Sequence, residues 1–69
     1  MTTIVQITND PDGYLGGDAN STDANLFIAA VEIVMATGVE EAAAVDIVLG
    51  EGDYIARMQD ILKNGYTPG

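Results

Sequence analysis

The chain has 69 residues, of which 11 are acidic and two are basic, so its formal net charge is −9. It contains no cysteine and no histidine, which excludes disulfides, thiolate or imidazole metal sites, and Ser-His or Cys-His catalysis. A domain of this size buries only about 60% of its surface on folding. We therefore expect one small acidic domain over residues 1–69, with no enzymatic activity, no cofactor and no metal site.

The acidic excess also favours some partners over others. Phosphate binding needs Lys and Arg, so direct binding to DNA, RNA or an anionic membrane is disfavoured. A positively charged protein partner is favoured, because long-range attraction accelerates the encounter. Acidity can also serve only to keep a small protein soluble, and this alternative stays open.

The sequence predicts neither a signal peptide nor a membrane span. The first residues, Met-Thr-Thr-Ile-Val-Gln, carry no basic side chain, and Glu32 interrupts the longest apolar run, from Leu26 to Ala36. A helix needs about 20 apolar residues to span a bilayer. We expect a cytoplasmic protein, located in the host cytoplasm if a phage encodes it.

The N-terminal segment from Thr2 to Thr8 predicts a β-strand, because it is β-branched almost throughout. On such a strand Val5 and Ile7 share one face. A lone strand is not stable in water. The segment is therefore expected to pair with a short returning strand, with residues 45–49 or with a second molecule.

The next segment, from Asn9 to Asn20, predicts a loop rich in Gly and Asp. Its residues Asp-Pro-Asp-Gly at 10–13 indicate a turn, after which Tyr14 and Leu15 can form the returning strand of a hairpin. Residues 1–20 are thus expected to form a strand and loop, and residues 21–66 three helices, which is an α+β fold that is mainly helical.

Three helices are expected in the second part of the chain. The first begins near Ser21 and ends at Thr37, before a glycine. The second covers residues 39–49, although residues 45–49 have the composition of a strand and this alternative stays open. The third covers Tyr54 to Asn64, with Asp53 as its N-cap and a glycine after its end.

The third helix has the clearest amphipathic pattern. The side chains expected to face inward are Tyr54, Ile55, Met58, Ile61 and Leu62, and those expected to face water are Ala56, Arg57, Gln59, Asp60 and Lys63.

Three possible sites are disfavoured by their spacing. Asp10, Asp12, Asp18 and Asn20 fit no register of a calcium-binding EF-hand loop. The glycines at 13–17 have neither the spacing nor the lysine of a phosphate-binding loop. A helix-turn-helix over residues 39–64 would bring acidic residues to the start of its recognition helix, where they would meet phosphates.

The carboxylates as a set suggest a different role. Rows of carboxylates can imitate the phosphates of a nucleic acid and occupy the basic groove of a protein that binds one. The residues expected to contact such a partner are Asp10, Asp12, Asp18, Asp23, Glu40, Glu41, Asp46, Glu51 and Asp53. A solvated acidic surface without a specific partner is the alternative.

The first two expected helices are apolar over an unusually wide arc. One small domain is not expected to cover all of this surface, which predicts a docking patch or a homodimer contact at Ile28, Met35, Val39 and Ile47. A homo-oligomeric assembly protein that packs these faces between subunits is therefore the alternative function.

In size, charge and the absence of catalytic residue types, the chain resembles the tiny acidic proteins that phages and mobile elements encode against host nucleic-acid-handling machinery, such as anti-CRISPR and anti-restriction inhibitors. The resemblance covers no motif and assigns no functional residue. It implies an inhibitor that docks on a basic protein surface, expected to belong to a nucleic-acid-binding protein.

Overall fold

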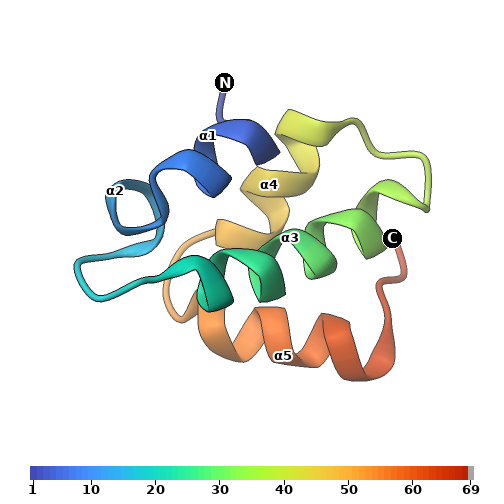
Figure 1. The fold of residues 1–69 in the computed structure, drawn as a ribbon. Helices are drawn as coiled ribbons and strands as arrows, with labels where there is room; N and C mark the ends of the chain where they lie inside the picture. Colours follow the sequence, from blue (N-terminus) through green and yellow to red (C-terminus); the bar gives the residue numbers. More distant parts are fainter. Residues whose placement is uncertain (69) are drawn as a thin grey trace.

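The computed structural model describes residues 1–68, which form five α-helices and no strand (Figure 1). The helices are α1 (Ile4–Asn9), α2 (Pro11–Leu15), α3 (Ser21–Met35), α4 (Glu41–Leu49) and α5 (Tyr54–Asn64). The prediction of an α+β fold with an N-terminal strand or β-hairpin is therefore wrong: the part predicted to be strand and loop contains two short helices.

Helix α1 lies in the segment predicted as a strand. Thr3 Oγ1 accepts a hydrogen bond from the Gln6 amide, and Gln6 Oε1 accepts one from the Thr3 amide at 2.8 Å, which is a capping box. Ile7 is completely buried whereas Val5 is 66% exposed, so the two side chains do not share a face. β-Branched composition misleads here because β-propensity mainly reflects packing context, and this segment packs as a helix against α2 and α3.

Helix α2 replaces the predicted turn and returning strand. Asp10 is its N-cap and accepts a hydrogen bond from the Gly13 amide at 3.3 Å. Pro11 occupies the first helical position, where a missing amide hydrogen costs nothing. Tyr14 and Leu15 complete the helix and are not a strand; Leu15 is buried.

Helix α3 is the central helix of the fold. It begins at Ser21 as predicted, with Asn20 as the N-cap in a capping box with Asp23. It ends at Met35, two residues before the predicted end, and Gly38 follows at a positive φ of 102°. Figure 1 shows α3 running through the middle of the molecule, and it contacts each of the other four helices.

Helices α4 and α5 were predicted more closely. Residues 45–49 are helical, so the strand alternative is wrong, and α4 begins at Glu41. Helix α5 has the predicted bounds, and Asp53 is its N-cap, accepting hydrogen bonds from the amides of Ile55 and Ala56. Both helices pack against α3 and against each other.

The buried side chains form one apolar cluster around α3 that contains no polar or charged group among the described residues. Phe27 lies at its centre, fully buried, and meets the ring of Tyr54 edge to face at 5.9 Å. Helices α1 and α2 both pack against α3 and cover a part of its wide apolar arc.

Candidate functional site

Four of the carboxylates predicted to contact a partner serve the fold itself. Asp10 and Asp53 are the N-caps of α2 and α5, and Asp23 closes the capping box of α3. Glu41 Oε2 accepts a hydrogen bond from the backbone amide of Ile4 at 3.2 Å. Each of these carboxylates satisfies amides at the start of a helix, where the helix dipole also favours negative charge.

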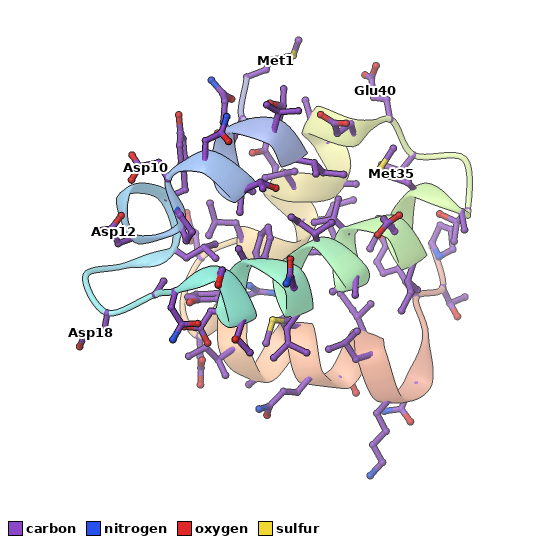
Figure 2. The ribbon with its side chains drawn as sticks, in the orientation of Figure 1. Met1, Asp10, Asp12, Asp18, Met35 and Glu40 are labelled. Carbon is purple, nitrogen blue, oxygen red and sulfur yellow. The ribbon has the colours of Figure 1, made fainter. Side chains whose placement is uncertain are left out.

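The other five predicted carboxylates are exposed, and their side chains are not held by hydrogen bonds within residues 1–68: Asp12, Asp18, Glu40, Asp46 and Glu51. They do not form a single row. Asp12 and Asp18, together with Asp10, lie on α2 and its flanking segments, at one end of the molecule in Figure 2. We call these three residues the acidic end. Glu40 lies far from them, before α4 (Figure 2).

One of the two basic residues is occupied inside the fold. Arg57 was predicted to face water, but it is half-buried. Its Nη1 donates to the carbonyl oxygens of Val48 and Leu49, both at 3.0 Å, and its Nη2 donates to that of Glu51 at 2.7 Å. The guanidinium thus binds the C-terminal end of α4, where a cation is favoured, instead of neutralising a surface carboxylate.

The predicted apolar patch is only partly accessible. Ile28, Met35, Val39 and Ile47 are half-buried and pack against the core. The most exposed large apolar side chains of the described residues are others: Met1, Val5, Leu26 and Ile55. Binding of a partner by the predicted four residues stays a prediction.

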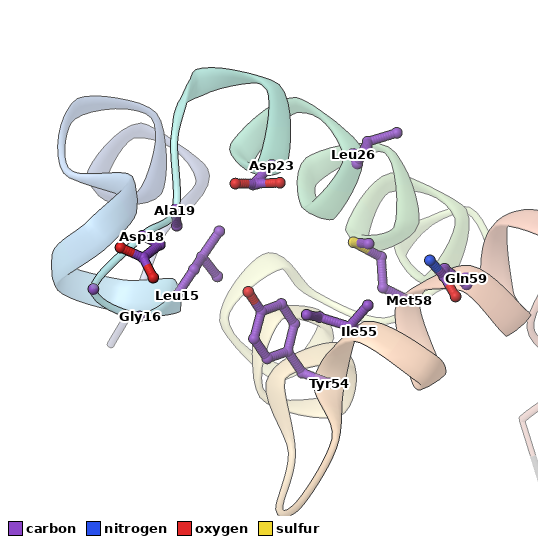
Figure 3. A pocket seen from close by; sticks show the side chains of 11 residues that line it. Leu15, Gly16, Asp18, Ala19, Asp23, Leu26, Tyr54, Ile55, Met58 and Gln59 are labelled. Atoms are coloured by element: carbon purple, nitrogen blue, oxygen red, sulfur yellow. The ribbon is translucent and has the colours of Figure 1, made fainter.

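Two of these exposed apolar residues line a pocket of about 350 Å³ between α3 and α5. We call it the α3–α5 groove (Figure 3). Leu26 of α3 and Ile55 of α5 lie at its sides, 44% and 48% exposed. Met58 also lines it, and residues 15–19, from the end of α2 into the next loop, close one end.

Polar groups gather at the end of the groove that residues 15–19 close. Asp18 and Asp23 both line it, and Figure 3 shows the hydroxyl group of Tyr54 pointing into the space near Leu15 and Asp23. One oxygen of Asp23 accepts the Asn20 amide at 3.0 Å, which leaves its other oxygen free to accept. The groove therefore combines apolar walls with two carboxylates and one hydroxyl group, a composition suited to a cation with an apolar stem.

Two further observations concern the described residues. No three acidic side chains among residues 1–68 come close enough to hold a metal ion. None of the helices in this part of the chain has the length and apolar character to cross a membrane.

The sequence pattern did not indicate the groove. Leu26 lies in the apolar run of the first expected helix, and Ile55 was expected to face inward from the third, but both are partly exposed. Of the residues that line the groove, only Asp18 and Asp23 had been predicted to contact a partner. No local signal identifies the groove, because it forms where two helices and a loop meet.

In comparisons with known proteins, no family model, no curated protein and no solved structure matches the chain.

Proposed function

We propose that the chain is an acidic inhibitor that docks on a basic protein surface, that of a nucleic-acid-binding protein, and blocks it. The observation that carries the proposal is that Arg57, one of the two basic residues, is occupied by contacts within the fold. Arg57 binds backbone carbonyl oxygens, so the exposed carboxylates keep their charge unpaired. The protein therefore presents a net charge of −9 to a partner on an accessible surface of 4207 Å².

The acidic end is the part of this surface best suited to the first contact. Asp12 and Asp18 project from a short helix and loop at one extremity (Figure 2), and both are exposed. Charges of one sign raise the association rate with a basic partner and help to select it. Affinity also needs a buried apolar contact at the centre of the interface, and the α3–α5 groove adjoins the acidic end through residue Asp18.

The decisive experiment asks whether the chain competes with nucleic acid. Proteins captured by the immobilised chain from nuclease-treated lysate of its native host are identified by mass, purified and loaded with labelled DNA or RNA. We expect the free chain to displace the label, and the displacement to weaken as salt rises from low to moderate levels, because surface charges are screened.

The matched comparison is a variant in which the five exposed carboxylates are replaced by their amides: Asp12→Asn, Asp18→Asn, Glu40→Gln, Asp46→Asn and Glu51→Gln. None of these side chains makes a capping hydrogen bond, Glu40 at the N-cap position of α4 included, so the variant should fold as the parent does. Displacement that is insensitive to salt and equal for both proteins, or captured proteins that bind no nucleic acid, would rule out the proposed function.

A homo-oligomeric assembly protein is the second candidate, favoured by the exposed apolar side chains of Val5, Leu26 and Ile55. Two copies with nine net negative charges each repel one another, so self-association should strengthen with salt. Light scattering at several protein and salt concentrations separates the two candidates, since the inhibitor is expected to be monomeric at low salt.

A further inference from the structure

We infer that the α3–α5 groove binds a Lys or Arg side chain of the partner protein together with an apolar residue next to it. This inference rests on the proposed function and adds a specific anchor point to it. The groove would hold the apolar residue and the aliphatic stem between its walls, and the charged head at the end that carries Asp18 and Asp23.

The walls of the groove provide the apolar half of this site. Leu26 and Ile55 are nearly half exposed although their helices bury other apolar residues well, and Met58 lines the groove beside them at 6% exposure. The volume of about 350 Å³ lies at the lower end of the range for ligand sites. This favours an occupant of side-chain size over a whole helix or strand.

The closed end of the groove provides the polar half. The carboxylates of Asp18 and Asp23 are acceptors only, and the Tyr54 hydroxyl group can accept as well. Hydrogen bonds between a cation and a carboxylate are about twice as strong as neutral ones. Lys and Arg also lay their aliphatic stems along apolar surfaces while the charged head reaches polar groups, which matches the order of groups along the groove.

Other occupants fit the groove less well. A phosphate or carboxylate group would meet Asp18 and Asp23 and be repelled. Among the described residues a second copy of the chain could offer only Lys63 as a free basic side chain, because Arg57 is held by three carbonyl oxygens. A basic segment of a different protein is the occupant that both the charge and the apolar walls favour.

The test is a titration of the ¹⁵N-labelled chain with the peptide acetyl-Gly-Leu-Arg-Gly-amide, followed by NMR. We expect the amide signals of residues 15–19, Leu26 and Ile55 to shift, and those near Glu40 to stay in place. The same peptide with citrulline in place of arginine keeps the shape but not the charge, and should bind about tenfold more weakly.

Two matched pairs of variants locate the contact. Asp18→Asn should weaken binding of the arginine peptide about five- to tenfold, whereas Glu32→Gln, which removes the same charge from an exposed position outside the groove, should change it less than about twofold. Leu26→Gln should weaken binding and Val5→Gln should not, since Val5 is exposed but does not line the groove.

Several outcomes would overturn the inference. Equal losses for Asp18→Asn and Glu32→Gln would show diffuse charge attraction, and absent shifts in the groove would show that the peptide binds elsewhere. Groove signals that move with protein concentration alone would indicate a second copy as the occupant. The first two outcomes leave salt-dependent displacement of nucleic acid untouched, so the inference can fail while the proposed function stands.

Discussion

The guanidinium group of Arg57 lies against the backbone of Gly50, so close that a Cβ atom at position 50 would be 2.7 Å from Nη1. Gly50 also has φ +47° and ψ −162°, a region of backbone conformation that is essentially restricted to glycine. The position of the Arg57 side chain therefore depends on a glycine at position 50, directly after α4.

Replacing this glycine should destabilise the whole fold. Gly50→Ala has to adopt a conformation that costs roughly 1–3 kcal/mol, and its methyl group displaces Arg57 from its carbonyl oxygens. Urea unfolding followed by circular dichroism measures the loss. Gly17→Ala is the control, because no atom lies within 4 Å of a Cβ there and its φ is not in the left-handed range. Equal midpoints for the two variants would contradict the proposed dependence.

Removing the guanidinium group tests the same contact from the other side. Arg57→Gln should lower the free energy of unfolding by about 1–2 kcal/mol, since a hydrogen-bonded charge is lost at a half-buried position. Lys63→Gln removes the same charge from an exposed position in the last turn of α5, and should cost about 0.5 kcal/mol or less. If the two losses were the same, Arg57 would act only through net charge.

The helical form of the N-terminal segment leads to opposite expectations for two neighbouring residues. Ile7→Ala should destabilise the protein by about 2–5 kcal/mol, because Ile7 is fully buried. Val5→Ala should be neutral or stabilising by up to about 0.7 kcal/mol, because Val5 is exposed and alanine favours helix. On a strand the two residues would share a face, so similar losses of stability would contradict α1.

Local sequence signals predicted a helix correctly where the N-cap, the apolar period and the terminal glycine were all present. Helix α5 has an Asp N-cap, a clean apolar period and a terminal glycine, and its bounds were predicted correctly. Helix α1 is only six residues long, too short to show a helical period. Its Thr3-x-x-Gln6 capping box was a local signal that the prediction did not use, and the Asp10-Pro11 start of α2 was interpreted as a turn.

The roles of individual charges depended on contacts between distant residues. The sequence determined that acids far outnumber bases and that Asp53 caps a helix, because composition and capping are local properties. Only the tertiary structure decided that Glu41 accepts the Ile4 amide and that Arg57 binds the end of α4. The α3–α5 groove likewise arises from packing, since the exposure of Leu26 and Ile55 depends on how the two helices and the loop before α3 meet.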